Sequence, residues 1–252
     1  SYPLTSWLTA NARGGFNTYT DAQVNLSRSG GVADPNGGVW NRDIRNTELD
    51  FNYFLTAQKP LSDDLDLTIT AGLNQNQRQY NSKFTEGDGI IDNSIQNLSS
   101  VTTVLGRSDF KRLQRLFAGY ADVNLGYKNF LYLGLTARND WSSTLVNPKD
   151  FKNSKNSYFY PGVSASLVLS EAMDLSSTPF SYAKVRASYT QVGNEATPYQ
   201  TATYYGFEIP FVTSSGTRVN RAGLGNLLGK ADLVNELTKE LEFGLDLRMF
   251  KN

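Results

Sequence analysis

The sequence predicts an all-β fold, an antiparallel sheet of about eight strands that forms a segment of a transmembrane β-barrel wall. Three observations predict it. Apolar and polar residues alternate strictly along eight segments, the apolar positions carry no charge, and short turns alternate with long polar connections. Strict alternation is typical of strands with one apolar face. Connections that alternate in length are typical of outer-membrane barrels. Residues 1–252 are interpreted as one partial domain of this kind.

The first strand is indicated by Leu8, Ala10, Ala12, Gly14 and Phe16, which alternate with polar or small residues. Seven further segments repeat the pattern. Taken at every second residue, their apolar positions lie within Leu49–Ala57, Leu65–Leu73, Phe117–Leu125, Leu131–Ala137, Pro161–Leu169, Ala183–Tyr189 and Leu241–Met249. With their flanking residues, these segments approach or exceed the roughly 9–11 residues that a tilted membrane strand needs.

Charged residues occupy only the opposite face of these segments. They are Arg13, Asp50, Asp66, Asp122, Lys184, Arg186, Glu242, Asp246 and Arg248. A charge on the lipid face at mid-membrane costs roughly 2–4 kcal/mol, so a bilayer would impose this segregation. We therefore expect Leu133, Leu167 and Leu245 to face lipid.

The connections predict the orientation of the chain. The short ones are Lys59–Asp64, Gly126–Asn129 and Ser170–Thr178, and the long ones are Thr20–Asn46, Asn81–Lys111, Ser142–Ser157 and Gln191–Asn235. In bacterial outer-membrane barrels, short turns are periplasmic and long loops are extracellular. We expect Asn81–Lys111 and Gln191–Asn235 to be the least regular parts.

Aromatic residues gather near the expected strand ends, as at Trp7, Tyr19, Tyr127 and Trp141. This favours the aromatic girdles of a membrane barrel, although aromatic residues also favour strands in general. A soluble β-sandwich or lipocalin-like barrel, with the apolar face turned inward, is the alternative. It is less favoured because such folds turn every 8–12 residues or so, whereas several segments here run longer.

Nothing in the sequence indicates an enzyme, a cofactor or a metal. Histidine and cysteine are both absent, which excludes Ser-His-Asp and Cys-His arrangements, disulfides and thiolate chemistry. The glycine-rich stretch 223–231 lacks the spacing of a phosphate loop, and Glu86–Asp92 lacks that of a calcium loop, although an ion site within 81–111 stays open. The formal net charge of zero gives no argument for nucleic acid as a partner.

Four segments resemble, in order, the strands of SusC/RagA-type TonB-dependent outer-membrane transporters. They are Arg115–Ser143, with its Arg-Asn-Asp-Trp-Ser-Ser ending, Tyr158–Met173, Lys184–Ala196 and Leu233–Phe250. The resemblance covers roughly residues 110–252, and residues 1–109 fit only by architecture. Trp141 stands where the family often has glycine, and Leu233-Val234-Asn235 replaces a proline-bearing version. Both departures leave the subfamily, and hence the substrate, open.

The resemblance implies a larger parent protein in the bacterial outer membrane. Members of the family close a barrel of about 22 strands, hold an N-terminal plug domain and carry a SusD-like surface lipoprotein as a lid. They import glycans or peptides with energy relayed by TonB. This chain shows no plug, so TonB would act through a missing N-terminal region, and the chain would supply about a third of the wall.

A complete eight-stranded outer-membrane barrel with an adhesive or structural role is the alternative function, and a soluble β-rich binding protein is a third. Finished outer-membrane barrels usually end on an aromatic residue, whereas Phe250 is followed by Lys251 and Asn252. We therefore expect the Leu8–Phe16 and Leu241–Met249 strands to pair with strands outside this segment and not with each other.

Aromatic residues, most of them in the long connections, are the candidate contacts for cargo or lid. They are Trp40, Trp141, Tyr199, Tyr204, Tyr205 and Phe207. Their rings could stack on sugar rings or on peptide side chains. They could equally pack the connections against themselves or against the lid, and this second interpretation is favoured.

Overall fold

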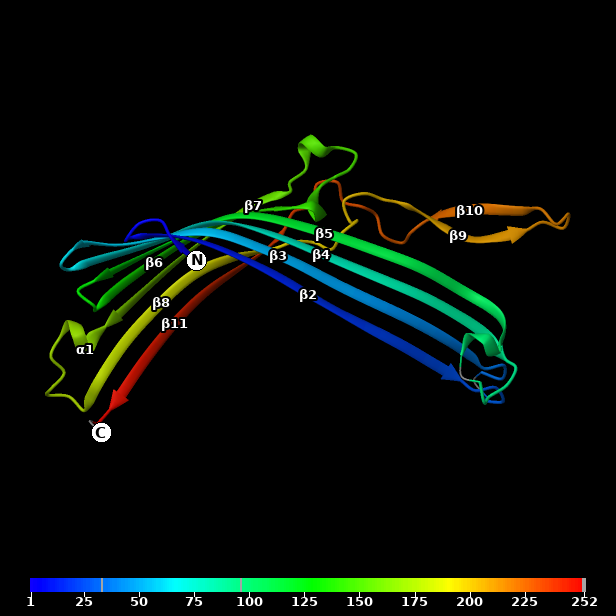
Figure 1. Ribbon diagram of the computed structural model, residues 1–252, viewed down its shortest axis with the longest axis horizontal. Coiled ribbons are helices and arrows are strands. Elements are labelled where there is room, and N and C mark those ends of the chain that lie inside the picture. Colours follow the sequence, from blue (N-terminus) through cyan, green and yellow to red (C-terminus); the bar gives the residue numbers. More distant parts are fainter. Residues whose placement is uncertain (33, 96, 251–252) are drawn as a thin grey trace. The chain divides into compact units, whose positions relative to one another are not determined.

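The structure, a computed structural model, describes residues 1–32, 34–95 and 97–250 and consists mostly of β-strands (Figure 1). The strands are β1 (Tyr2–Pro3), β2 (Leu8–Ser27), β3 (Gly38–Ser62), β4 (Leu65–Ile90), β5 (Val101–Tyr127), β6 (Leu131–Ser142), β7 (Ser157–Val168), β8 (Phe180–Asn194), β9 (Tyr205–Val212), β10 (Arg218–Leu224) and β11 (Glu236–Met249). The short helices are η1 (Leu98–Ser100), η2 (Ser143–Leu145), η3 (Phe151–Asn153) and α1 (Leu169–Ala172). No helix among the described residues is long and apolar enough to cross a membrane.

Nine strands form one sheet in the order β1-β2-β3-β4-β5-β6-β7-β8-β11, and β9 and β10 form a separate hairpin. Consecutive long strands are therefore neighbours, as in a meander. A closed eight-stranded barrel would require β2 and β11 to hydrogen-bond to each other. In the described part of the chain, β11 lies at one end of the strand order, whereas β2 lies one strand from the other end, where it pairs with the two-residue strand β1. The expected all-β, antiparallel wall segment is confirmed, and the pairing that closes a small barrel is not formed.

The chain divides into two compact units, to both of which β2, β3, β4 and β5 contribute residues. The first unit comprises Ser1–Arg13, Phe51–Gln75 and Arg115–Asn252, and the second comprises Gly14–Asp50 and Asn76–Gln114. Figure 1 shows β6, β7, β8 and β11 of the first unit running side by side.

In the first unit, the strand register places the predicted apolar positions on one exposed face. Leu133 in β6 lies opposite Leu125 in β5 and Ala165 in β7. The same holds further along the sheet, where Val185 in β8 pairs with Leu245 in β11. Leu133 is 42% exposed and Leu245 is 60% exposed. Within the described residues, these side chains are not covered by a second layer, as the inner face of a sandwich would be.

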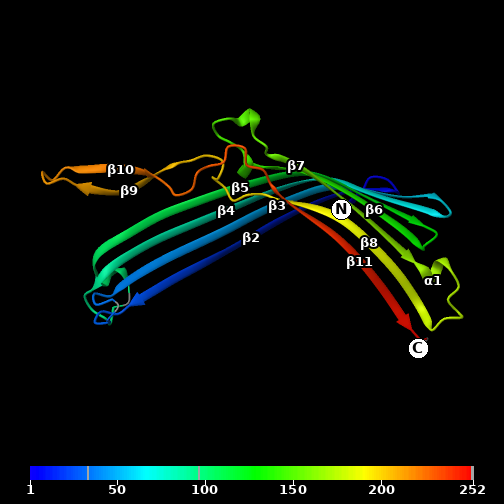
Figure 2. The same cartoon turned by 180° about the vertical axis from the view of Figure 1, so that it is seen from behind.

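Three short connections of the first unit lie next to one another. The backbone N–H of Lys128, in the β5–β6 turn, donates to the carbonyl of Asp64 in the β3–β4 turn over 2.8 Å. The Val168 N–H, at the end of β7, donates to the Phe130 carbonyl over 2.7 Å, and α1 follows at this end of the sheet (Figure 2). The expected grouping of the short turns on one side is therefore observed.

The β5–β6 turn has the backbone of a tight hairpin. Lys128 and Asn129 have φ values of 47° and 60°, which correspond to the two positive-φ positions of a type I′ turn. The Lys128 ammonium lies 3.4 Å from the Asp64 carboxylate. This carboxylate, followed by the Tyr127 hydroxyl, raises the pKa of the Lys128 amine.

The expectation that Asn81–Lys111 is irregular is wrong. β4 runs to Ile90 and β5 begins at Val101, so only 91–100 lies outside these two strands, with η1 at its end. Similarly, much of Thr20–Asn46 belongs to β2 and β3, and Gln191–Asn235 contains the β9–β10 hairpin. Backbone hydrogen bonds maintain a ladder even where neither face is apolar, so the loss of alternation did not mark the end of the strands.

Candidate functional site

The face of the first unit opposite the apolar face carries hydrogen-bonded polar side chains. On β6, the side chains of Arg138 and Asp140 alternate with those of the apolar face because successive residues of a strand point to opposite sides. Their cross-strand partners on β7 are Tyr160 and Tyr158. A polar surface therefore lies directly behind the apolar one.

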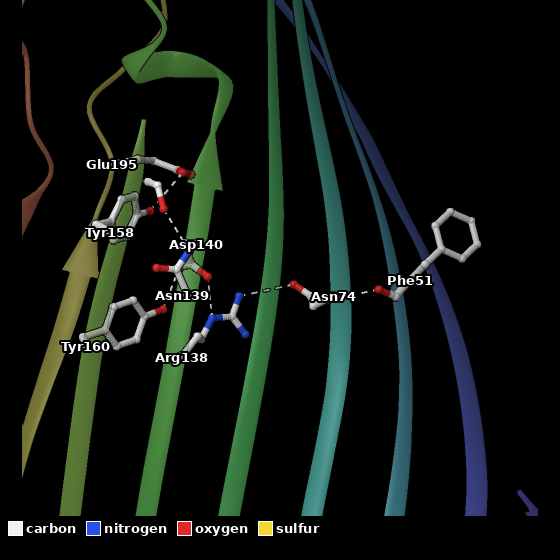
Figure 3. A network of polar contacts seen from close by, with 9 residues as sticks. Phe51, Asn74, Arg138, Asn139, Asp140, Tyr158, Tyr160 and Glu195 are labelled. Carbon is white, nitrogen blue, oxygen red and sulfur yellow. Dashed lines mark hydrogen bonds and ion pairs between the residues drawn. The ribbon is translucent and has the colours of Figure 1, made fainter. Parts of the chain in front are cut away.

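Asp140 is the centre of this polar network (Figure 3). Its carboxylate accepts a hydrogen bond from Arg138 Nε at 2.7 Å and another from the Tyr160 hydroxyl at 2.6 Å. Arg138 Nη2 reaches Asn74 Oδ1 at 3.4 Å, and Asn74 donates to the backbone carbonyl of Phe51 at 3.2 Å. The Asp140 side chain is only 4% exposed, and the Arg138 side chain is 29% exposed. The carboxylate charge is therefore neutralised by a guanidinium group that is itself largely withdrawn from solvent.

A second part of this face ties β3 to β5. The Tyr120 hydroxyl donates to Asn52 Oδ1 over 2.8 Å. The Tyr120 ring passes over Gly72, where an added Cβ would lie 2.6 Å from the Phe54 Cβ and 2.7 Å from the ring. Gly72 therefore provides the space in which this side chain lies. Arg13 covers the Phe54 ring at 5.1 Å.

A hollow of about 440 Å³ lies on the polar side of β6, β7 and β8. Its polar lining consists of small residues, Gly134, Ser164, Ser166 and Ser188, together with Asn124, Tyr132, Arg186 and Glu242. Arg186 lies 3.8 Å from Asp246, with both side chains about half exposed. Small hydroxyl side chains flanked by exposed charges form a wet surface that can exchange hydrogen bonds with a passing polar solute.

The second unit is polar on both faces of its strands. One face carries the group formed by Glu48, Asn76 and Arg78, in which Glu48 accepts from Asn76 at 2.8 Å and from Arg78 at 2.9 Å. The opposite face carries Asp43, Arg45, Gln77, Gln79, Lys83, Asp109 and Lys111. No lipid-facing stripe is present among these positions.

Arginine and aromatic side chains line a hollow on the Glu48 face of the second unit. Arg42 lies over the Trp40 ring at 5.7 Å and over the Phe84 ring at 5.1 Å, and Arg112 lies over the Tyr80 ring at 5.0 Å. The hollow measures about 470 Å³ and is lined by Arg42, Tyr80, Ser82, Phe84, Ser108, Phe110 and Arg112. We call these seven residues the arginine–aromatic hollow.

The structure separates the six aromatic residues that the sequence singled out. Trp40 borders the arginine–aromatic hollow through Arg42. Trp141 instead pairs with Phe117 in the β5–β6 register, with ring centroids 5.6 Å apart, and so lies on the apolar face. Trp141 therefore does not join the polar face. Tyr199, Tyr204, Tyr205 and Phe207 lie on the β8–β11 connection, and each is at least half exposed.

Sequence reasoning missed Arg42 and Arg112. Arg42 lies in Thr20–Asn46, which was expected to be a polar connection, and Arg112 directly follows another, Asn81–Lys111. The two arginines meet only through the pairing of three strands. The available signal was the recurrence of arginine and aromatic residues at even positions, as at Trp40 and Arg42 and again at Phe110 and Arg112.

No family model matches the chain, and no curated protein matches it. Solved structures do. A structure of the RagAB peptide transporter matches with a TM-score of 0.77 and 17% identity, over 98% of this chain and 27% of that chain. The RagAB peptide importer matches in its open-open state (TM-score 0.76, 16% identity) and in its closed-closed state (TM-score 0.79, 17% identity).

The match in the open-open state covers 98% of this chain, and the match in the closed-closed state covers 99%. In each case, this chain spans 27% of the matched chain, about a quarter of its length. The predicted resemblance to SusC/RagA-type transporters is therefore confirmed in the fold. At these identities the likeness shows the fold alone: the chain folds as a segment of the RagAB transporter structures does.

Proposed function

We propose that the chain forms part of the wall of a SusC-type, TonB-dependent importer in a bacterial outer membrane. The observation that carries the proposal is the separation of two faces on the same strands of a RagAB-like sheet. Leu133 and Leu245 lie on an exposed apolar face, and the Arg138–Asp140–Tyr160 network lies on the other. An apolar exterior and a polar interior are what a solute-conducting barrel requires.

The orientation follows from the same observations. The apolar run on each of β3, β4 and β5 has about the length that spans a bilayer, whereas these strands have 25, 26 and 27 residues. We place the parts that are polar on both faces outside the cell and the short turns, such as Lys128–Asn129, in the periplasm. The residues of the first unit's apolar face would contact outer-membrane lipid.

Oligopeptides are the proposed cargo, and glycans are the alternative class. Peptide transport is the activity named for the RagAB structures. The hollow beside Arg186 and Glu242 offers charges of both signs and serine hydroxyls, which suit a peptide backbone with mixed side chains. The sequence has no histidine and no cysteine, and the matched structures are transporters, so we propose transport and no catalysis.

The function is tested by deleting the gene and measuring the uptake of fluorescent oligopeptides by whole cells. We expect uptake to fall to background and to return when the gene is restored. A protonophore should abolish the restored uptake, because transport through TonB draws energy from the inner membrane. Undiminished peptide uptake in the deletion strain would refute the proposal, and a loss confined to oligosaccharide uptake would replace peptide with glycan as the cargo.

The β9–β10 hairpin is the proposed contact for a SusD-like lipoprotein lid. Its apolar side chains are unusually exposed: Phe207 is 94% exposed and Tyr205 is 70% exposed, and Leu228, which follows the hairpin, is 83% exposed. Interface hot spots are enriched in large side chains, Trp, Tyr and Arg among them, that become fully buried in the partner.

Phe207→Ala is expected to weaken association with the lipoprotein expressed alongside the protein by about tenfold or more, since hot-spot truncation costs roughly 2 kcal/mol. Co-purification of the two proteins in detergent measures the effect. Phe151→Ala is the matched control, because Phe151 is 72% exposed on a different long connection. Equal retention of the lipoprotein by both variants would remove the hairpin from the lid interface.

A further inference from the structure

The two arginines of the arginine–aromatic hollow lack acidic partners. In the part of the chain that the structure describes, neither Arg42 nor Arg112 belongs to an ion pair. The lining of the hollow contains two guanidinium groups and no carboxylate. Uncompensated positive charge in a concave surface attracts anions from solution.

The carboxylates of Glu48 and Glu86, on the same face, lie against other groups. The Glu48 carboxylate is held by Asn76 and Arg78, through contacts of 2.8 and 2.9 Å. The Glu86 carboxylate leans toward Gly106 of β5, where an added Cβ would lie 3.7 Å from Glu86 Oε2. Neither acid forms an ion pair with Arg42 or Arg112 in the described structure.

Both guanidinium groups lie over aromatic rings. Arg42 lies over two rings at 5.7 and 5.1 Å, and Arg112 lies over one at 5.0 Å. Stacking occupies the flat face of a guanidinium group and leaves its N–H edge free to donate two parallel hydrogen bonds to a carboxylate. The Ser82 and Ser108 hydroxyls in the same lining can supply further hydrogen bonds.

From these observations we infer that the arginine–aromatic hollow binds carboxylate groups and gives the transporter a preference for acidic oligopeptides. This inference rests on the proposed transport function and names the class of cargo. The guanidinium groups lie over the Trp40, Phe84 and Tyr80 rings, and the Phe110 ring packs edge-on against Tyr80 at 6.3 Å, so little aromatic surface in the hollow is left for a sugar ring. Glutamate and aspartate side chains and a peptide C-terminus provide the carboxylates.

The test uses the intact transporter purified in detergent, with a fluorescent glutamate-rich oligopeptide and its analogue in which every glutamate is glutamine. We expect the wild-type protein to bind the glutamate peptide about tenfold more tightly, or better, because each charge-assisted hydrogen bond exceeds a neutral one by roughly a factor of two in energy. The double variant Arg42→Gln/Arg112→Gln should lose this preference while its affinity for the glutamine peptide stays constant.

The matched control is Arg45→Gln/Arg107→Gln, which removes the same charge from the opposite face of the same two strands. This control should retain the preference. Addition of salt should weaken binding of the glutamate peptide more than binding of its analogue, since salt screens exposed charges.

Equal affinity of the wild-type protein for the two peptides would overturn the inference, as would equal losses in both double variants. Tighter binding of an oligogalacturonate than of the glutamate peptide would overturn the assignment to peptides. These outcomes differ from failure of the proposed function, in which the deletion strain imports both peptides normally.

Discussion

Leu135→Arg is expected to reduce the amount of assembled protein in the outer membrane more than tenfold. Leu135 lies between Val123 and Val163 on the exposed apolar face, within the central part of β6. An arginine at the mid-plane of the lipid face of a barrel costs roughly 2–4 kcal/mol. A loss of 1.4 kcal/mol corresponds to about a factor of ten in the equilibrium between folded and unfolded protein.

Tyr132→Arg is the control, because it introduces the same side chain on the polar face of the same strand. Tyr132 is 42% exposed, against 51% for Leu135, and lines the polar hollow. Assembly of this variant should stay within about twofold of the wild type, since substitutions at exposed polar sites usually change stability by less than about 0.5 kcal/mol. Heat-modifiable migration of the outer-membrane fraction measures assembly. Equal assembly of the two variants would mean that the lipid-facing side has been assigned wrongly.

The alternation of residue types was enough to predict these faces. Leu245 in β11 and Val185 in β8 were placed on one apolar face by their odd positions alone, and the register pairs them directly. This works because the side-chain period of a strand is two. A shift of one residue would place the charge of Asp246 on the lipid side, so register and burial constrain each other.

The same reasoning failed where both faces are polar. Between Asn81 and Lys111, neither the even nor the odd positions form an apolar set, so the pattern resembles that of a loop. The structure nevertheless continues β4 to Ile90 and starts β5 at Val101. A strand that has a hydrogen-bonded strand on each side needs no apolar face, because backbone hydrogen bonds to both neighbours hold it in the sheet.

Sites that depend on cross-strand neighbours could not be predicted from the sequence either. Arg138 and Asp140 are two residues apart, and their shared face was predictable. Tyr160 comes from the next strand, and its contact with Asp140 depends on a register in which Arg138 faces Tyr160. Alternation specifies the face of a residue, but not its partner on the neighbouring strand.

Asp140→Ala is expected to lower the free energy of unfolding by about 2–3 kcal/mol. Removing one partner of a buried pair typically costs 3–5 kcal/mol because the other charge is left uncompensated. A loss below this range is expected here because the Arg138 side chain is 29% exposed, against 4% for Asp140, and water stabilises part of the guanidinium charge. Loss of the acceptor for the Tyr160 hydroxyl contributes to the effect, since the Tyr160–Asp140 bond is 2.6 Å long.

The variants Tyr160→Phe and Arg138→Gln separate these contributions. Tyr160→Phe removes one hydrogen bond to a charged group and should cost about 1.5–3 kcal/mol at most. The double variant Arg138→Gln/Asp140→Ala removes both charges together, and its loss should be smaller than the sum of the two single losses because the partners are in direct contact. The midpoint of denaturant-induced unfolding of the intact protein measures each value. Strict additivity in this cycle would show that Arg138 and Asp140 do not stabilise each other, and the polar face would then be held by its backbone ladder alone.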